Sequence, residues 1–295
     1  MGNLEGRVAV VTGAGRGIGR AHAELLAAEG AAVVANDAPG DGASAAREVI
    51  AAIASAGHQA VAAIEDVARW SGAERLIAVA VDHFGRLDIL VNNAGIVRFG
   101  TADESPEADW DETMRVNLKG HIGPSHFAAR HWRARAAAGE TVYGRIINTT
   151  SGAAYLGLPG FACYDTAKAG VIGLTVAMAQ ELADIGVTVN AVAPAARTGM
   201  TSHLVQMRAP ARGFDAYAPE NNSPLVAWLA SPAAAHVSGQ VLAVLGDRVE
   251  LIGPMEPVAS VEAGGQRWTA DALAVAAPSL FSGHRSGVLA LGPVE

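Results

Sequence analysis

The sequence predicts an α/β fold built on a single, doubly wound parallel β-sheet, followed by a C-terminal extension. Three observations support this prediction. Short apolar runs rich in β-branched residues alternate with longer stretches of helical pattern. A glycine-rich turn joins the first apolar run to the first helical stretch. Polar residues follow directly after several of the runs, and the carboxyl ends of parallel strands meet at one edge of a sheet, where ligands bind.

The expected elements follow one another in a regular, Rossmann-like order. Strands are expected at residues 7–11, 31–36, 59–64, 87–91, 144–149, 186–192 and 240–245. Helices are expected at residues 20–29, 44–56, 71–84, 106–135 and 166–182, and Gly120, Gly123 and Pro124 should bend the fourth of them. No repeat or low-complexity linker divides the chain, so residues 1–247 should form one domain. Residues 248–295 should form an extension that is not an independent domain, in which Thr269 caps a helix start.

Composition and charge exclude several classes of protein. The chain has 295 residues, 51% of them hydrophobic, and a formal net charge of −8. Because it shows no basic stripe, nucleic acid is not expected as a partner. A single cysteine, Cys163, permits no internal disulfide and fits a reducing compartment. We find no signal-peptide pattern and no apolar run of about eighteen residues, so we expect a soluble, cytoplasmic protein without membrane contacts. No metal site is expected.

The segment Thr12–Gly19, between the first strand and the first helix, predicts a phosphate-binding turn. Glycines let the backbone approach a phosphate at a helix N-terminus, where free N–H groups and the helix dipole favour an anion. The second strand is followed by Asp37, and an acid there can bind both ribose hydroxyls of the adenosine half of a dinucleotide. We therefore expect dinucleotide binding by residues 1–247. The residues of the turn expected to contact the cofactor are Gly13, Arg16, Gly17, Ile18 and Gly19.

A second motif predicts chemistry that moves a proton. Tyr164 and Lys168 lie four residues apart where a helical pattern begins, so they share one helix face. A nearby ammonium favours the phenolate and lowers the pKa of a phenol from about 10 toward the working range. Ser151, at the end of an expected strand, could donate a hydrogen bond to an oxygen held by the tyrosine. Of the 21 lysines and arginines only Lys119 and Lys168 are lysines, which favours a specific role for a compact ammonium.

These residues resemble the short-chain dehydrogenase/reductase family, and the resemblance covers residues 4–247. Thr12–Gly19 looks like the cofactor loop of that family, and Asn92–Gly95 looks like its structural turn. The residues that match its catalytic tetrad are Asn117, Ser151, Tyr164 and Lys168.

The resemblance implies a role for each member of the tetrad. Tyr164 would be the acid/base, and Ser151 would position the substrate oxygen. Lys168 would hold the nicotinamide ribose and lower the pKa of Tyr164. Asn117 would hold a water that links Lys168 to solvent. The implied reaction is the interconversion of a secondary alcohol and a ketone, with a small-molecule substrate and a nicotinamide cofactor.

Further cofactor contacts are implied by the same resemblance. They are Asp66 and Val67 at the adenine, Asn93 to Gly95 beside the adenosine ribose, and Pro194 and Thr198 at the nicotinamide carboxamide. Ala195 stands where the family usually has glycine. The backbone between Ala195 and Thr198 could therefore follow a different path from that of the family, and the role given to Thr198 depends on this path. Arg16 is of a kind that often accompanies NADP, whereas the carboxylate of Asp37 would repel a 2′-phosphate. Because Asp37 acts on the ribose more directly, we predict NAD.

A narrower resemblance points to the hydroxyacyl-CoA dehydrogenase part of peroxisomal multifunctional enzymes. The segments that carry it are residues 34–37, 193–201 and 219–229. The substrate is therefore expected to be a secondary alcohol or ketone, 3-hydroxyacyl-CoA or steroid-like. Residues 200–222 should form a lid over it. The lid mixes apolar side chains with arginines: Leu204, Val205, Met207, Phe214 and Tyr217 with Arg208 and Arg212.

Two other functions use the same pattern. A non-catalytic dinucleotide-binding regulator or scaffold could lose the tetrad without penalty, yet all four residues are present. An epimerase or dehydratase would share the proton chemistry, but such enzymes usually carry a larger C-terminal substrate domain. The expected helix 166–182 is apolar nearly all round, and a helix that is hydrophobic on every side is buried on every side. We therefore expect a homodimer or homotetramer.

Overall fold

The computed structural model describes residues 2–201, 208–210, 212–253 and 255–285. The described chain falls into two units, Met1–Ile252 and Gly253–Glu295. The first unit carries every expected strand and, in addition, the strand that follows the expected boundary at Asp247. The second unit contains α9 (Ala270–Ala276), whose start is capped as expected: the hydroxyl of Thr269 accepts a 3.1 Å hydrogen bond from the N–H of Ala272.

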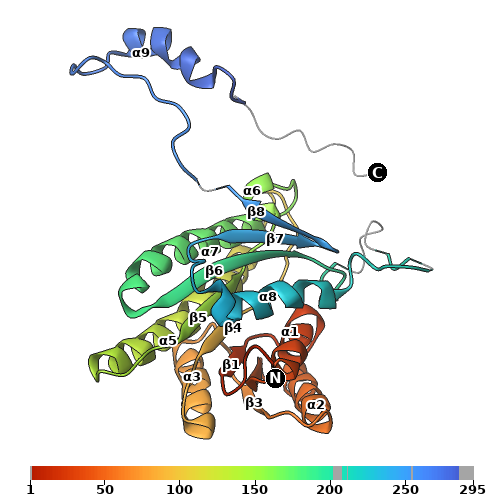
Figure 1. The fold of residues 1–295 in the computed structure, drawn as a ribbon. Helices are drawn as coiled ribbons and strands as arrows, with labels where there is room; N and C mark the ends of the chain where they lie inside the picture. Colours follow the sequence, from red (N-terminus) through yellow and green to blue (C-terminus); the bar gives the residue numbers. More distant parts are fainter. Residues whose placement is uncertain (1, 202–207, 211, 254, 286–295) are drawn as a thin grey trace. The chain divides into compact units, whose positions relative to one another are not determined.

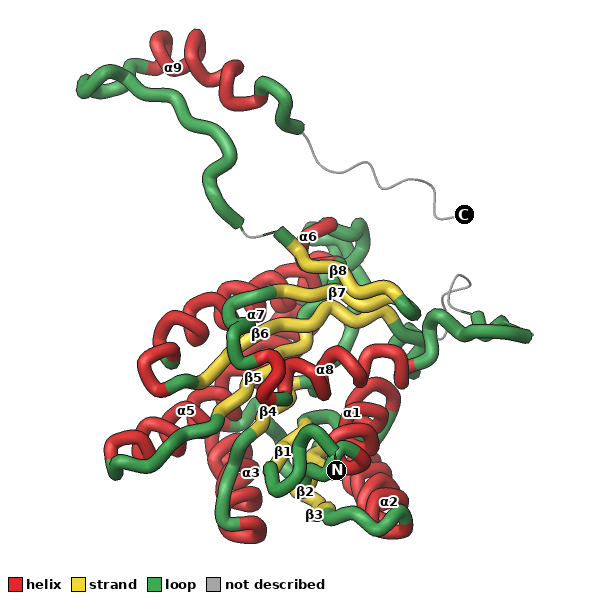
Figure 2. The backbone as a smooth tube through the Cα atoms, viewed as in Figure 1, coloured by secondary structure: helices red, strands yellow, loops and turns green. Residues whose placement is uncertain are grey.

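A single eight-stranded sheet organises the described part of the first unit (Figures 1 and 2). The strand order is β3-β2-β1-β4-β5-β6-β7-β8, parallel throughout except for the last, antiparallel pair. The strands are β1 (Val8–Val11), β2 (Ala32–Asp37), β3 (Ala60–Ile64), β4 (Ile89–Asn92), β5 (Gly144–Thr149), β6 (Val187–Ala195), β7 (Val241–Leu245) and β8 (Arg248–Ile252). The order reverses between β1 and β4, and such switch points are where doubly wound sheets bind ligands. The predicted fold class is confirmed.

Helices cover both faces of this sheet. They are α1 (Gly17–Ala28), α2 (Asp41–Ser55), α3 (Trp70–Phe84), α4 (Glu107–Met114), α5 (Gly120–Ala137), α6 (Ala153–Leu156), α7 (Ala162–Glu181) and α8 (Ser223–Ala230). Side chains alternate along each strand, so Ala9 and Val11 of β1 join one core cluster and Val8 and Val10 the other. The first cluster is completed by α1, α2 and α8, and the second by α3, α5 and α7. Strands of a parallel sheet covered on both faces read as apolar runs, and all four residues of β1, Val-Ala-Val-Val, are buried.

The long helical region expected at 106–135 is interrupted, but not where the sequence suggested. A π-helical turn, Arg115–Lys119, separates α4 from α5 and carries Asn117. Gly123 and Pro124 instead lie within α5. A Cβ on Gly123 would lie 2.9 Å from the Cβ of Ala73, so this glycine allows α5 to approach α3 closely. Single π turns inside helices are frequent at functional sites.

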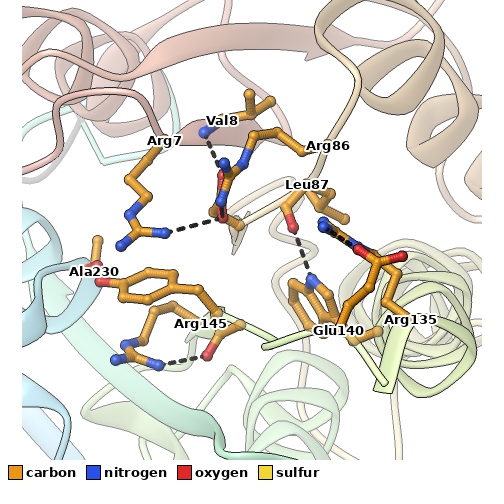
Figure 3. A network of polar contacts seen from close by, with 12 residues as sticks. Arg7, Val8, Arg86, Leu87, Arg135, Glu140, Arg145 and Ala230 are labelled. Carbon is orange, nitrogen blue, oxygen red and sulfur yellow. Dashed lines mark hydrogen bonds and ion pairs between the residues drawn. The ribbon is translucent and has the colours of Figure 1, made fainter. Parts of the chain in front are cut away.

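The edge of the sheet formed by the strand N-termini is held by a charged network (Figure 3). Asp88, buried just before β4, accepts two 2.7 Å hydrogen bonds from the Arg86 guanidinium. The ring of Tyr143 lies between two further guanidinium groups, 3.7 Å from Arg7 and 4.1 Å from Arg145. These contacts fix the edge that carries none of the predicted site residues. Within the described residues, no helix is long and apolar enough to cross a membrane.

Candidate active site

The predicted site residues gather at the opposite edge, where the parallel strands have their carboxyl ends. The glycine-rich turn follows β1, Asp37 ends β2, and Asn93 follows β4. Ser151 comes two residues after β5, and Pro194 lies in the last part of β6. The sheet pairing places these strand ends side by side, with β1 between β2 and β4 and β5 between β4 and β6.

The glycine-rich turn has no room for side chains at two of its glycines. Gly13 has a positive φ of 63°, and a Cβ on it would lie 2.9 Å from the Cα of Ala94. A Cβ on Gly19 would lie 2.1 Å from the carbonyl oxygen of Gly13. The amide of Asn93 braces the turn, donating to the carbonyls of Thr12 at 3.0 Å and of Gly13 at 3.3 Å. The turn therefore packs closely against the segment after β4 and ends at the N-terminus of α1, where free N–H groups favour an anion.

Asp37 is fixed beside this turn by backbone donors. Its Oδ2 accepts a 3.0 Å hydrogen bond from the N–H of Gly15, and its Oδ1 accepts one of 2.8 Å from the N–H of Ala38. A Cβ on Gly42 would lie 2.5 Å from Oδ1, so the start of α2 closes over the carboxylate. Arg16 points elsewhere: its Nη2 donates to the carbonyl of Asp41 at 3.3 Å. The carboxylate is thus held in one orientation and keeps lone pairs for hydroxyl donors.

Asp66 and Val67 follow β3 and lie close to the turn that carries Asn117. Asp66 accepts a 3.0 Å hydrogen bond from the N–H of Ala68 and a 2.8 Å bond from Arg115 of the π turn. Val67 is buried, and a Cβ on Gly120 would lie 3.4 Å from it. Both residues therefore join β3 to the start of α5. Their contact with adenine stays a prediction.

Lys168 is buried in α7, with 2% of its surface exposed. Its Nζ donates a 2.7 Å hydrogen bond to the carbonyl of Thr149, the last residue of β5. Burial lowers the pKa of Lys168 to about 7. A Cβ on Gly95 would lie 3.6 Å from this Nζ and 3.3 Å from Oδ1 of Asn117. Gly95, Asn117 and Lys168 therefore meet at one point, although they come from three different segments.

Both ends of the Asn117 amide are engaged by one residue. Its Nδ2 donates to the carbonyl of Ile96 at 2.8 Å, and its Oδ1 accepts from the N–H of Ile96 at 2.7 Å. This pair fixes the segment after β4 against the π turn. The water that Asn117 was expected to hold stays a prediction. The side-chain amide of Asn117 is bonded to the backbone of Ile96.

Tyr164 lies in the first turn of α7, beside Ser151. Burial raises the pKa of Tyr164, a hydrogen bond with Ser151 lowers it, and the charge of Asp165 raises it further. The Nζ of Lys168 is 5.9 Å from the centre of the tyrosine ring. The sequence predicted a lowered pKa for this phenol, whereas in this structure burial raises that pKa and the ammonium of Lys168 is bonded to the carbonyl of Thr149.

A family described as short chain dehydrogenase matches residues 7–209. The chain belongs to the short-chain dehydrogenase/reductase family. It is accordingly an oxidoreductase, and the family resemblance predicted from its motifs is confirmed.

Two relatives show where this dehydrogenase lies within the family. The hydroxyacyl-CoA dehydrogenase ChsB1 of Mycobacterium tuberculosis is 41% identical over 289 residues, 96% of this chain and 90% of the relative. The mouse peroxisomal multifunctional enzyme type 2 is 38% identical over 232 residues, 77% of this chain but only 30% of that longer protein. Both fit the narrower resemblance predicted from residues 34–37, 193–201 and 219–229.

Solved structures agree with this placement. A short chain dehydrogenase from Mycobacterium avium has a TM-score of 0.87 and 44% identity, covering 97% of this chain and 98% of that one. A short chain dehydrogenase from Burkholderia cenocepacia in complex with NADP has a TM-score of 0.73 and 34% identity, covering 83% and 98%. Membership of the family therefore establishes a nicotinamide dinucleotide cofactor for this dehydrogenase. Whether that cofactor is NAD or NADP depends on the residues around Asp37.

The segment after β6 reaches the glycine-rich turn despite the alanine at 195. The backbone of Ala195 continues β6 and pairs with Leu245, and no described residue other than glycine has a positive φ. Glycine is therefore not needed there. Thr198 lies against the turn, since a Cβ on Gly17 would be 3.2 Å from its Cγ2.

Part of the expected lid is described. Arg197 and Asp215 form an ion pair at its base, and the N–H of Arg197 donates to the carbonyl of Tyr217 at 2.7 Å. Phe214, Arg208 and Arg212 are exposed. Leu204, Val205 and Met207 lie outside the described residues.

Two residues near the tetrad did not stand out in the sequence. His121, four residues after Asn117, is fully buried, and its pKa is lowered well below the ordinary value by burial and then by the charge of Lys168. Asp165 follows Tyr164 directly, and its Oδ2 accepts a 2.7 Å hydrogen bond from the N–H of Leu158. Helical spacing from Asn117 could have pointed to His121. The position beside Tyr164 could have pointed to Asp165.

Among the described residues, no group of three or more His, Cys, Asp or Glu side chains could hold a metal ion.

Proposed function

We propose that this short-chain dehydrogenase/reductase is NAD-dependent, that it interconverts a secondary alcohol and a ketone, and that its substrate is a 3-hydroxyacyl-CoA or its 3-oxo counterpart. The observation that supports the reaction best is the convergence of Tyr164, Ser151, Lys168 and Asn117 at the carboxyl ends of β4 and β5. They come from three separate segments, because Tyr164 and Lys168 share α7, and the glycine-rich turn lies at the neighbouring strand end.

The side chains divide the proton chemistry among themselves. Bound NAD would supply the hydride acceptor. The hydroxyl of Ser151 would hold the substrate oxygen, and the oxygen of Tyr164 would take the alcohol proton during oxidation and return it during reduction. The ammonium of Lys168 would hold the ribose of the cofactor, and its positive charge would act against the rise that burial causes in the pKa of Tyr164. Asn117 keeps the segment after β4 in place through its two bonds to Ile96.

The preference for NAD rests on Asp37. Its carboxylate is fixed by the N–H groups of Gly15 and Ala38, in a place where an acid can bind both ribose hydroxyls. A 2′-phosphate there would meet a fixed negative charge. Arg16 donates through its Nη2 to the carbonyl of Asp41. The Burkholderia relative was solved with NADP, so family membership alone does not decide between the two cofactors. The negative charge of Asp37 is what supports NAD for this chain.

The substrate class rests on the relatives and on the residues around Tyr164. One relative that matches 96% of this chain is a hydroxyacyl-CoA dehydrogenase. The rings of Phe99 and Phe161 pack edge to face with centres 5.1 Å apart, and Phe161 is 6.3 Å from the ring of Tyr164. Such an apolar wall suits an acyl chain, and the exposed Arg208 and Arg212 suit the phosphates of a coenzyme A.

A substrate panel followed by NADH absorbance tests the proposal. It should contain 3-hydroxyacyl-CoA esters of several chain lengths, the matching free hydroxy acids, and hydroxysteroids, each with NAD and with NADP. We expect turnover of a coenzyme A ester with NAD to exceed all other combinations. Tight NAD binding by calorimetry, without turnover of any panel member, would instead support a non-catalytic regulator. Faster turnover with NADP would contradict the role given to Asp37.

A further inference from the structure

The carboxylate of Asp165 joins the first turn of α7 to the loop that precedes it. Its Oδ2 accepts a 2.7 Å hydrogen bond from the N–H of Leu158, seven residues earlier in the chain. That loop runs from the end of α6 to the start of α7 and contains Gly157 and Gly160, both with positive φ. Two such glycines allow a loop many conformations. A single charge-assisted hydrogen bond to its middle therefore restricts it strongly.

The same loop is tied to the segment that follows β4. The N–H of Gly100 donates a 2.8 Å hydrogen bond to the carbonyl of Gly160, and Gly100 forms an isolated parallel bridge with Phe161. These ties bring the ring of Phe99 against that of Phe161, with centres 5.1 Å apart. Phe161 in turn stands 6.3 Å from the ring of Tyr164. The loop anchored by Asp165 thus carries Phe161 and holds it against Phe99, and these two rings form the aromatic wall beside the reactive phenol.

We propose that Asp165 is a positioning residue for the reaction: by anchoring Leu158 to α7, its carboxylate holds the aromatic wall of Phe99 and Phe161 in the place that receives the acyl part of the substrate. The proposal rests on the proposed function, because it assigns that wall to the substrate. It differs from the roles of the tetrad, since Asp165 acts through the loop and not on the reacting atoms.

The charge of Asp165 has a second consequence for Tyr164. The carboxylate stands next to the phenol in the chain and raises the pKa of Tyr164, so it makes the phenolate harder to form. Burial in turn raises the pKa of Asp165 to about 6, and the bond from Leu158 lowers it. Asp165 makes no ion pair within the described residues, and its Oδ1 is buried without a partner there. The titratable groups on α7 and on the elements that contact it include Tyr164 and Lys168 on α7, Tyr155 on α6, Arg115 and Lys119 on the π turn, and Glu107, Asp109, Asp111 and Glu112 on α4.

Three variants separate the anchor from the charge. Asp165→Ala removes the acceptor and the charge together. Asp165→Asn removes the charge but keeps an oxygen that can accept from Leu158. Thr166→Ala changes the exposed neighbour on the same helix turn and is the matched control. Two measurements are made on the full chain: hydrogen–deuterium exchange of the peptide that carries Leu158, and kcat and KM across pH with NAD and 3-hydroxybutyryl-CoA.

We expect Asp165→Ala to exchange faster at Leu158 and to raise KM roughly tenfold, since a hydrogen bond to a charged group is lost, with a smaller change in kcat. Asp165→Asn should stay near the wild type in exchange and in KM. In both variants, the rise of kcat/KM with pH during alcohol oxidation should move to lower pH, because the phenolate of Tyr164 forms more easily without the neighbouring charge. Thr166→Ala should change none of these.

Unchanged exchange at Leu158 in Asp165→Ala would overturn the anchor. Faster exchange without a rise in KM would overturn the link to the substrate. An unmoved pH profile in both variants would overturn the effect on Tyr164. Exchange is measured without turnover, so a wild type that fails to oxidise any substrate would count against the proposed function while the anchor is still tested.

Discussion

The ammonium of Lys168, in α7, donates a 2.7 Å hydrogen bond to the carbonyl of Thr149, the last residue of β5. Thr150, the next residue, forms a second bond between the same two segments: its hydroxyl donates to the carbonyl of Lys168 at 2.8 Å. These two bonds lock the helix of Tyr164 to the strand end that precedes Ser151. The distance between acid/base and serine is thus set by the strand and helix rather than by the loop between them, and elements position catalytic groups more accurately than loops do.

Replacing Tyr164 by phenylalanine should abolish turnover while leaving NAD binding intact. The phenol is the proposed acid/base, and loss of such a group typically costs about a hundredfold or more. NADH absorbance measures the rate, and calorimetry measures NAD binding. Tyr155→Phe, in the neighbouring α6, is the matched control and should keep its activity. A Tyr164→Phe enzyme that kept more than about a hundredth of the wild-type rate would contradict the assignment.

Replacing Lys168 by arginine should also impair the enzyme. The side chain is buried, and a planar guanidinium cannot take the place of a compact ammonium against the carbonyl of Thr149. Misplacement of that group by about 1 Å could lower kcat/KM roughly a hundredfold. Lys119 is the other lysine of the chain and is exposed, so Lys119→Arg is a control that should behave like the wild type. Equal activity of the two variants would remove the special role of Lys168.

Replacing Asp37 by alanine should weaken the preference for NAD over NADP. The variant loses a fixed carboxylate that we expect to accept from the ribose hydroxyls, and KM for NAD should rise about tenfold or more. Turnover with NADP should improve, because the repulsion of the 2′-phosphate is removed. The ratio of kcat/KM for the two cofactors is the quantity to measure. Arg16→Ala should leave the NAD value unchanged and lower any residual use of NADP, and the opposite pattern would assign the choice to Arg16.

Much of this site could be predicted because its residues come in fixed local patterns. The glycines of the turn, Asp37 at a strand end, and Tyr164 four residues before Lys168 are all visible from spacing alone. What could not be predicted depends on contacts between segments distant in sequence. The π turn around Asn117 is stabilised by Ile96, and the sequence placed the irregularity at Gly120, Gly123 and Pro124, where glycine instead serves close packing.

Other elements of the fold were also missed, among them α8 and β8, each for its own reason. In α8, Ser223–Ala230, nearly every residue is apolar and the helix is short, so it shows no helical period. Pro224 fits its first turn, where a missing N–H costs nothing. In β8, most residues are exposed, so no buried apolar run marks the strand. Its pairing with β7 follows from the tight turn at Gly246, whose φ is 60°.

Replacing Asp165 by asparagine should stabilise the protein at neutral pH. The pKa of Asp165 is raised from 3.8 to about 6 in the folded chain, so between these values the folded state binds more protons than the unfolded state. Wild-type stability therefore falls as pH rises through this window, whereas the variant has no such group. The variant should gain on the order of 1 kcal/mol by pH 7, because the partly exposed carboxylate is screened by solvent, and nothing below about pH 4.

Urea unfolding of the two proteins between pH 4 and pH 8 measures this difference. Thr166→Ala is again the control, since its stability relative to the wild type should not vary with pH. A constant difference between Asp165→Asn and the wild type over the whole range would mean that the carboxylate does not titrate near 6. A stabilised variant with the wild-type KM and a pH profile moved to lower pH would agree with the positioning role proposed for the residue.

The last prediction concerns assembly, and α7 is its basis. The side of α7 that carries Ala169, Gly173 and Val176 is exposed in the single chain, with Val176 42% exposed. The opposite side packs on the sheet through Val171 and Met178. An apolar helix face without cover marks an interaction surface, and a second copy of α7 is the simplest partner. We therefore predict a homodimer at least.

Light scattering tests this prediction with variants on two different surfaces. Val176→Arg should convert dimers to monomers, because it places a charge in the paired face. Val249→Arg, on the exposed side of β8, is the matched control and should leave the dimer intact. A chain ending at Ile252 keeps β8 and lacks the second unit, so it shows whether residues 253–295 are needed for a tetramer. A monomeric full chain would contradict the prediction. A dimer broken by Val249→Arg and not by Val176→Arg would place the interface at β8. Unchanged assembly after truncation would show that residues 253–295 are not part of the interface.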